Sequence, residues 1–254
     1  MRERRIRCYG TPIALAVYFP GMHGDVVAEF LLEAIGLSKQ YGEGTQAIHV
    51  LRDLYLAIRP TERVAIVGES GVGKSTLLHI LGMLDQPTAG RVLLDGQDLF
   101  ALSEPERAAL RNREIGFIFQ FHHLLPDFTA LENVAMPGLI AGLSLPEARQ
   151  RAQTMLEQVG LADRLTHRPG ELSGGEQQRV AVARALVMKP RIILGDEPTG
   201  NLDPVTGESV LRLLLDLNQQ LGATLAVVTH SEKLAAAMDR TLRLQHGQLK
   251  DISR

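Results

Sequence analysis

The chain reads Gly68-Glu69-Ser70-Gly71-Val72-Gly73-Lys74-Ser75-Thr76 directly after the apolar run Val64 to Val67, and the helical segment Thr76 to Leu81 follows. This stretch fits the pattern G-x-x-x-x-G-K-[ST] in the strand, loop and helix context that the pattern requires. Glycines let successive backbone N–H groups point at one anion, and the helix N-terminus adds a partial positive charge. The sequence therefore predicts a site for a nucleoside triphosphate, in which Lys74 reaches the β- and γ-phosphates and Ser75 binds Mg²⁺.

The composition is that of an ordinary globular protein. With 254 residues, of which 45% are hydrophobic, the chain is long enough for one large α/β domain or two small ones. A net charge of −2 gives no reason to expect a nucleic-acid partner. The single cysteine, Cys8, can form neither an internal disulfide nor a metal cluster, which suits a reducing compartment. The apolar run from Ile13 to Phe19 is too short to cross a bilayer.

The first residues differ from the rest of the chain. Four arginines precede that short apolar run, and patterned sequence starts only near Val26. We interpret residues 1–25 as an extension that is either without order or upstream of the true start, and our hypothesis is that translation begins at Met22.

The distribution of apolar runs predicts an α/β fold in three parts. Short β-like runs near the phosphate loop, with the turn signal Asp95-Gly96, predict an antiparallel part that faces the adenine: Val27 to Leu32, Leu51 to Ile58 and Arg91 to Leu94. Apolar runs alternating with helical segments predict buried parallel strands in a layered core: Val64 to Val67, Ile115 to Phe119, Ile192 to Leu194 and Thr224 to Val228. A helical subdomain, residues 101–170, is expected to be inserted in this core.

Helix signals mark the segments between these strands. Ser103 with Glu106, and Ser144 with Glu147, have the spacing of capping boxes. Asp203-Pro204 predicts the start of a helix that ends before Gly222. Its apolar residues form a stripe that we expect to pack on the core: Val210, Leu211, Leu213, Leu214 and Leu217.

Two carboxylates follow the apolar run Ile192 to Leu194. Asp196 is placed to bind Mg²⁺, while Glu197 is placed to meet the attacking water, which divides metal binding from base catalysis. Alone, two acidic residues at a strand end would be unremarkable, and the phosphate loop in the same chain gives them this interpretation.

A second anion-binding helix start is predicted at Ser173-Gly174-Gly175, before a helix that runs from about Gln177 to Met188. One nucleotide already has its β- and γ-phosphates held by residues 68–76. We therefore expect Ser173, Gly174 and Gly175 to bind the γ-phosphate of an ATP molecule held by another copy of the chain.

Together these motifs resemble the ATP-binding cassette (ABC) family in order and approximate spacing. The resemblance extends over about residues 27–250 and rests on five motifs besides the phosphate loop: Gln120 after a strand, Leu172 to Arg179, Gly195 to Pro198, Asn201-Leu202-Asp203, and Thr229-His230. It implies a P-loop NTPase core with an antiparallel β subdomain and an inserted α-helical subdomain. It also implies a head-to-tail dimer with two ATP molecules and Mg²⁺ between the protomers.

The resemblance carries further roles onto matching positions. Tyr41 would stack on the adenine, and Gln120 would contact Mg²⁺ and sense the γ-phosphate. Asp203 would organise the dimer interface, and His230 would contact the γ-phosphate. On the sequence alone a lone tyrosine such as Tyr41 is more often a surface or turn residue, and His230 could be a hydrogen-bonded strand end.

The segment from Gln120 to Pro137 continues past the nucleotide-sensing glutamine into the helical insertion, so it can transmit the nucleotide state to a partner. His122-His123 lacks further ligands at suitable spacing and is interpreted as a surface or partner contact, not a metal site. This segment, with His167-Arg168-Pro169, resembles the branch of the family that works at the cytoplasmic face of the inner membrane and drives the release of outer-membrane-directed lipoproteins to a periplasmic carrier. The implied partners are integral membrane subunits, with lipoprotein cargo contacted only indirectly.

Two other functions remain open at this stage. A related transporter ATPase could serve cell division or the export of macrolide-like compounds, because the core motifs are shared. A non-transport member acting on ribosomes or DNA is less compatible with the chain, which has neither a second cassette nor a long coiled-coil insertion.

Overall fold

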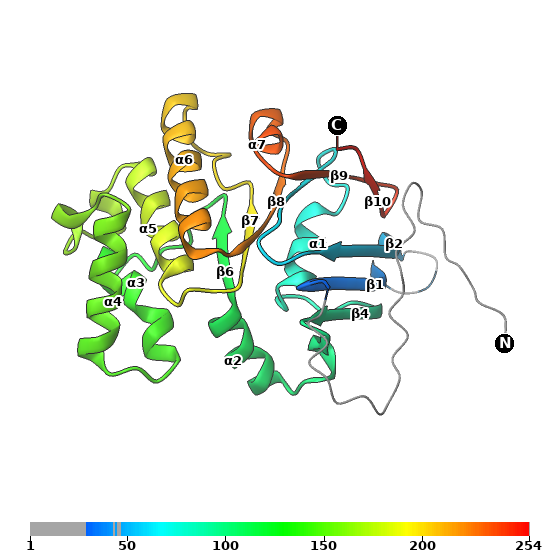
Figure 1. The fold of residues 1–254 in the computed structure, drawn as a ribbon, viewed down its shortest axis with the longest axis horizontal. Coiled ribbons are helices and arrows are strands. Elements are labelled where there is room, and N and C mark those ends of the chain that lie inside the picture. The colour runs from blue at the N-terminus through cyan, green and yellow to red at the C-terminus, as the bar shows by residue number, and fades with distance from the viewer. Residues whose placement is uncertain (1–28, 43, 45–46, 254) are drawn as a thin grey trace.

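A computed structural model describes residues 29–42, 44 and 47–253. A six-stranded sheet lies in the middle of the molecule, with helices α3 to α6 on the left of Figure 1 and an antiparallel sheet on the right. The proposed extension 1–25 and the hypothetical start at Met22 lie outside the described residues. Within the described residues, no helix combines the length and the apolar character needed to cross a membrane.

The six-stranded sheet has the order β10-β9-β3-β8-β7-β6 and is parallel except for the edge strand β10. Its strands are β3 (Arg63–Val67), β6 (Ile115–Phe119), β7 (Ile192–Asp196), β8 (Thr224–Thr229), β9 (Arg240–Gln245) and β10 (Gln248–Asp251). The four predicted parallel strands are confirmed, each within two residues of its expected bounds. Their continuous apolar runs follow from burial on both faces.

The two faces of this sheet contribute to different hydrophobic clusters. Leu225 and Val227 of β8 pack with helices α3 to α6, whereas Ala226 and Val228 pack with α1 and the antiparallel sheet. Because successive side chains of a strand point to opposite faces, one strand supplies both clusters. The sheet thus joins the helical side of the molecule to the antiparallel side.

The four-stranded sheet has the order β2-β1-β4-β5, with β1 (Leu32–Tyr41), β2 (Ile48–Ile58), β4 (Ala89–Leu94) and β5 (Gln97–Asp98). The expected turn at Asp95-Gly96 is confirmed, with φ values of 52° and 76°. The expected strand from Val27 to Leu32 is wrong for residues 29–31, because β1 begins at Leu32. Gly36, with φ of 61°, lies at a register shift that breaks the alternation of β1, so the period that identifies a strand is missing.

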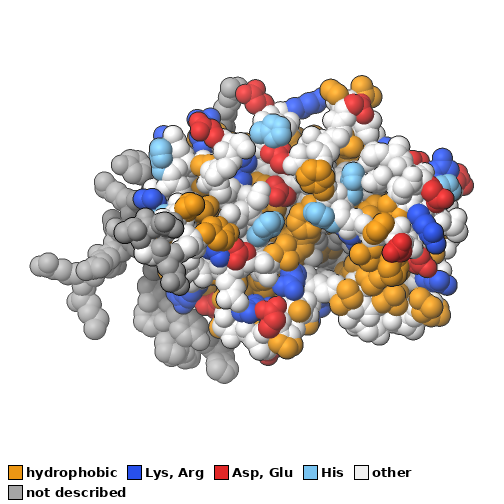
Figure 2. Space-filling model, turned by 180° about the vertical axis from the view of Figure 1, so that it is seen from behind, with side chains coloured by type: hydrophobic (Ala, Val, Ile, Leu, Met, Phe, Trp, Pro, Cys, Tyr) orange, Lys and Arg blue, Asp and Glu red, His pale blue; other side chains and the backbone are white. Residues whose placement is uncertain are grey.

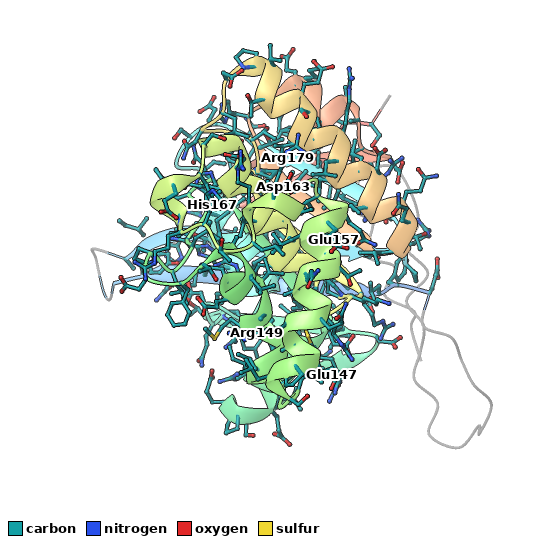
Figure 3. All side chains as sticks on the ribbon, turned by 90° about the vertical axis from the view of Figure 1, so that its left-hand side faces the viewer. Glu147, Arg149, Glu157, Asp163, His167 and Arg179 are labelled. Carbon is teal, nitrogen blue, oxygen red and sulfur yellow. The ribbon has the colours of Figure 1, made fainter. Side chains whose placement is uncertain are left out.

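The helices are α1 (Lys74–Leu81), α2 (Glu104–Glu114), α3 (Ala130–Ile140), α4 (Leu145–Gln158), α5 (Gly174–Leu186), α6 (Pro204–Leu221) and α7 (Glu232–Ala236), with short 3₁₀ turns η2 (Leu99–Ala101), η3 (Ala162–Arg164) and η4 (Pro169–Glu171). Ser103 and Glu106 form the expected capping box before α2. Before α4 only half of the expected box forms, because Glu147 pairs with Arg151 instead of returning to Ser144. Figure 3 shows α4 from the side, with Glu147 near its start and Glu157 near its end.

Helix α6 starts and ends as expected. Asp203 caps its N-terminus, and Gly222 follows its last residue in the left-handed conformation. Val210, Leu211, Leu214 and Leu217 are buried, and Leu213 packs against the same cluster from a partly buried position. Within the range 101–170, β6 belongs to the six-stranded sheet while α3 and α4 form the helical part with α5. The bounds of the insertion stay a prediction.

Helix α5 approaches the sheet closely at Gly116 of β6. A Cβ atom at this position would collide with the backbone carbonyl of Ala185 on α5. We expect Gly116→Ala to lower the free energy of unfolding by about 2 kcal/mol, because neither backbone can yield without disturbing the core. Gly170→Ala is the matched control, since nothing lies within 4 Å of its Cβ position. Equal thermal unfolding of the two variants would contradict this description of the packing.

Candidate functional site

The carboxyl ends of four neighbouring parallel strands meet at one edge of the sheet. Val67 of β3 is in register with Thr229 of β8, while Asp196 of β7 is in register with Val228 of β8 and with Phe119 of β6. The phosphate loop, Glu197, Gln120 and His230 each follow directly from one of these ends. In open α/β sheets, ligands bind in the crevice outside the carboxyl ends of the strands.

The phosphate loop connects β3 to α1. Gly71 and Gly73 have φ values of 77° and 106°, a region that side chains disfavour. A Cβ atom on Gly73 would also collide with Val50, so this turn requires glycine on two counts. Lys74 Nζ donates to the carbonyls of Gly68 and Glu69 at 2.8 and 2.9 Å, which holds the cation at the loop itself. Ser75 and Thr76 lie in the first turn of α1, where backbone N–H groups lack partners within the helix.

Glu197 is held by three neighbours from strand β8 and the residues that follow it. Its backbone N–H donates to the Val228 carbonyl at 2.9 Å, and φ of 46° places it in the left-handed region. Its two carboxylate oxygens have different partners: Thr229 Oγ1 donates to one at 2.9 Å, and His230 Nδ1 lies 2.7 Å from the other. The structure thus brings together Glu197 and His230, which the sequence assigned to one site.

Gln120 begins the segment after β6 and is tied to Asn201. Gln120 Nε2 donates to Asn201 Oδ1 at 2.9 Å, and Asn201 Nδ2 returns a hydrogen bond to the Gln120 carbonyl at 3.0 Å. The donor end of the Gln120 side chain is therefore occupied, and its oxygen is the end left to accept from a donor or to contact a cation.

Ser173 is the N-cap of α5 and forms a capping box with Glu176. The backbone N–H and hydroxyl of Ser173 donate to Glu176 Oε2 at 2.8 and 2.9 Å. These hydrogen bonds lower the pKa of the Glu176 carboxyl, and the bond from the Ser173 backbone N–H has the largest effect. Arg164 lowers the same pKa further. In the described part of the chain no hydrogen bond links Ser173, Gly174 or Gly175 to residues 68–76 of the same protomer.

Asp203 lies at the other helix start near this edge. Its Oδ1 accepts from the backbone N–H groups of Val205 and Thr206 at 3.1 Å each, and these contacts, led by those of Thr206, lower the pKa of its carboxyl. A groove of about 910 Å³ runs beside it, and its lining includes Glu197 and His230. In the single chain Asp203 therefore acts as a helix cap, while its place beside this groove suits the expected interface.

Tyr41 ends strand β1 and is 44% exposed. Its hydroxyl donates to Asp85 Oδ2 at 2.7 Å, and Lys39 Nζ holds the other Asp85 oxygen at 2.6 Å while lying 4.7 Å from the Tyr41 ring centroid. Burial, followed by the hydrogen bond to Asp85, raises the pKa of Tyr41. The ring is thus fixed at its edge and keeps an accessible face.

Three residues that hold the site residues in place were given no role from the sequence. Thr229, Asn201 and Asp85 contact Glu197, Gln120 and Tyr41 respectively. Thr229 and Asn201 lie inside the motifs Thr229-His230 and Asn201-Leu202-Asp203, so the only sign of a role in the sequence was that each lies close to a predicted site residue. Asp85 lies 44 positions from Tyr41 and gave none.

The model of the family described as ABC transporter matches residues 51–200, more than half of the chain. The chain belongs to the ABC transporter family and is an ATPase that binds nucleotide. The matched range includes the phosphate loop, Gln120, Ser173 to Gly175 and the Asp196-Glu197 pair.

Curated relatives extend the likeness to nearly their whole length. The lipoprotein-releasing system ATP-binding protein LolD of Geobacter metallireducens is 55% identical over 219 residues, covering 86% of this chain and 97% of that protein. LolD of Pseudomonas fluorescens is 56% identical over 222 residues, covering 87% of this chain and 98% of that protein. Among solved structures, a dimeric post-hydrolysis state of the ATP-binding cassette MJ0796 bound to ADP and Pi matches with a TM-score of 0.80 at 40% identity, covering 88% of this chain and 99% of that chain.

The buried hydroxyl of Thr229 offers a test of how Glu197 is oriented. We expect Thr229→Val to lower the kcat of ATP hydrolysis about tenfold with little change in ATP affinity, because one carboxylate oxygen loses its donor. Thr229→Ser, which keeps the donor and also the acceptor for the Ser231 N–H, should retain most of the rate. A Thr229→Val enzyme with wild-type kcat would show that this hydrogen bond has no part in hydrolysis.

Proposed function

We propose that the chain is the ATP-hydrolysing subunit of an inner-membrane transporter that releases outer-membrane-directed lipoproteins to a periplasmic carrier. The observation that carries the proposal is its 55 to 56% identity to LolD proteins over 97 to 98% of their length. It would lie on the cytoplasmic side of the membrane as a peripheral subunit, in two copies, and its integral membrane partners would contact the cargo.

In this proposal residues 68–76 hold the triphosphate and Tyr41 stacks on the adenine through its accessible face. The donor set around the phosphate loop fits Mg²⁺, because the Ser75 hydroxyl, the Gln120 amide oxygen and the Asp196 carboxylate are hard oxygen ligands. The Gln120 amide nitrogen donates to Asn201, which leaves the amide oxygen free to bind Mg²⁺. Bound Mg²⁺ would neutralise the charge that develops on the β- and γ-phosphates.

Glu197 would act as the general base for the attacking water. Thr229 and His230 each hold one of its carboxylate oxygens, so little reorientation is needed at the moment of reaction. His230 would also contact the γ-phosphate. Its side chain is 71% exposed, so it can reach a ligand while Glu197, 13% exposed, stays in place.

The site of one protomer would be completed by a second copy. Ser173, Gly174 and Gly175 have no bond to the phosphate loop of their own chain, and their helix start offers backbone N–H groups to an anion. A γ-phosphate presented by the partner protomer would fit there, and Asp203 would lie at the interface between the copies. The dimeric arrangement of the similar cassette MJ0796 supports this proposal.

The membrane subunits would dock in a groove of about 460 Å³ between the sheet and helix α3. Its lining is mostly apolar and includes Phe119, Pro137 and Ile140, with His123 from the segment after Gln120 and Arg184 from helix α5. Phe121 and Ile140 are 66% and 68% exposed. Seen from behind in Figure 2, hydrophobic side chains gather on the side of the molecule where α3 and α4 lie. Exposed apolar surface of this kind is typical of an interaction site.

The base role of Glu197 has a direct test. We expect Glu197→Gln to bind ATP with near wild-type affinity, to hydrolyse it at least about a hundredfold more slowly, and to accumulate as a dimer with ATP. Calorimetry, phosphate release and light scattering measure the three quantities. Steady-state hydrolysis near the wild-type rate would exclude Glu197 as the base.

The docking groove and the transport task are tested together by recovering the Glu197→Gln protein from native membranes with ATP. We expect membrane proteins with large periplasmic domains, and lipoproteins, to be retained. Adding Ile140→Glu should abolish this recovery, whereas Ile48→Glu, on the antiparallel sheet with a similar exposure of 66%, should not. Recovery of division proteins, an efflux assembly or ribosomes would keep the ATPase and overturn the lipoprotein assignment.

A further inference from the structure

Helix α5 holds the backbone on both sides of Gln120. Before Gln120, the Gln178 side-chain amide donates to the Phe119 carbonyl at 3.3 Å. After Gln120, Arg184 donates from Nη1 to the His123 carbonyl at 2.6 Å and from Nη2 to the His122 carbonyl at 2.7 Å. Neither α5 residue was given a role from the sequence, and neither belongs to the ATP site described above.

The orientation of Gln178 is determined by its surroundings. The side chain is 1% exposed, and its Nε2 also donates to the Pro198 carbonyl at 2.6 Å. Two carbonyl acceptors require the nitrogen to face them, so the amide cannot flip without losing both bonds. Because Pro198 follows Glu197 directly, one buried amide joins α5 to the segments of both Gln120 and Glu197.

The charged guanidinium of Arg184 donates its hydrogen bonds to backbone carbonyls. Among the described residues burial alone shifts the pKa of its guanidinium, downwards, and no carboxylate contributes. Its fork bonds two successive carbonyls, a geometry that a planar guanidinium provides and an ammonium does not. One of them belongs to His123, whose φ of 47° is uncommon for a residue with a side chain. The fork thus stabilises the bend by which the chain leaves Gln120 for the groove.

The N-terminal end of α5 is also held by hydrogen bonds to the residues around it. Ser173 caps the helix, and Gln177 Nε2 donates to the carbonyls of Pro169 and Leu172 at 3.0 Å each. Helix α5 therefore connects two sets of hydrogen bonds, one at Ser173 to Gly175 and one around Gln120, without an intervening loop.

We infer that Gln178 and Arg184 are positioning residues for Gln120, through which α5 links the helix start at Ser173 to the Gln120 side chain during ATP hydrolysis. The inference rests on the proposed contact of Gln120 with Mg²⁺ and the γ-phosphate. An ATP molecule bound at Ser173 by one protomer then influences Gln120 in the site of the other nucleotide. The same hydrogen bonds shape one wall of the docking groove.

A double-mutant cycle between Arg184→Gln and Gln120→Ala tests the inference. We expect Arg184→Gln to lower kcat about tenfold and to raise the Mg²⁺ concentration for half-maximal rate, with ATP binding in the absence of Mg²⁺ unchanged. In the Gln120→Ala background the same change should leave kcat almost unaltered, because the side chain that Arg184 positions is already absent. An equal loss in both backgrounds, or no loss in either, would overturn the inference.

Arg179 supplies a matched control. It lies on the same helix (Figure 3) and donates to the Val159 carbonyl and to Ser209 Oγ, but among the described residues it makes no hydrogen bond to the residues next to Gln120. Whatever effect Arg179→Gln has should therefore be the same with and without Gln120. If Arg184→Gln does not fold, Arg184→Lys replaces it. A lysine reaches one carbonyl at a time, so an intermediate kcat is expected, and a wild-type kcat would contradict the requirement for a fork.

The proposed role of Gln120 can fail separately. A Gln120→Ala enzyme with wild-type kcat and Mg²⁺ dependence would remove that role and this inference with it. Loss of hydrolysis in Glu197→Gln would still support the ATPase site. An impaired Gln120→Ala enzyme beside an unaffected Arg184→Gln enzyme would overturn the inference alone.

Discussion

The parallel register of β3, β8, β7 and β6 is the constraint on which the rest of the structure depends. Each strand carries its functional residue just beyond its last ladder pair, so the hydrogen bonds of the sheet align the phosphate loop, His230, Glu197 and Gln120. A slip of one residue would turn every side chain of a strand to the opposite face. Two hydrophobic clusters, one on each face, oppose such a slip.

Beyond the strand ends, the functional segments hold each other in place. Glu197 depends on Thr229 and His230 from β8 and the residue after it, while Gln120 depends on Asn201. Helix α5 adds bonds to the backbone on both sides of Gln120. The members of such a network reinforce one another, and a change in one member is felt by the others. In our proposal, these bonds are the route by which the ATPase site at the sheet edge would influence the groove beside α3.

The local features of this fold could be predicted from the sequence. Four buried runs became parallel strands, and the turn at Asp95-Gly96, the cap at Ser103 and the limits of α6 were recognisable from short patterns. Strand β1 was not recognised, because the register shift at Gly36 interrupts its alternation. The box at Ser144 formed only in part, because Glu147 had a competing partner, Arg151, one turn along the helix.

The site, like the fold, could be predicted from the sequence only in part. Residues in contiguous motifs were predicted, and their segments meet where the strands end. Gln178 and Arg184 were given no role, because their partners lie 20 to 62 positions away and are backbone carbonyls, which no side-chain pattern marks. Pairing across such distances is set by how α5 packs against β6, including the close approach at Gly116, and becomes visible only in three dimensions.

In our proposal two copies of the chain complete each other's ATP site, which can be tested by mixing two inactive variants. Lys74→Ala removes the phosphate-loop cation, and Ser173→Arg blocks the helix start offered to the partner. In a mixed dimer one site would carry both changes and the other neither. The account predicts that an equal mixture regains about a quarter of the wild-type ATPase rate, because half of randomly formed dimers are mixed and each has one intact site. A mixture as inactive as its two components would contradict it.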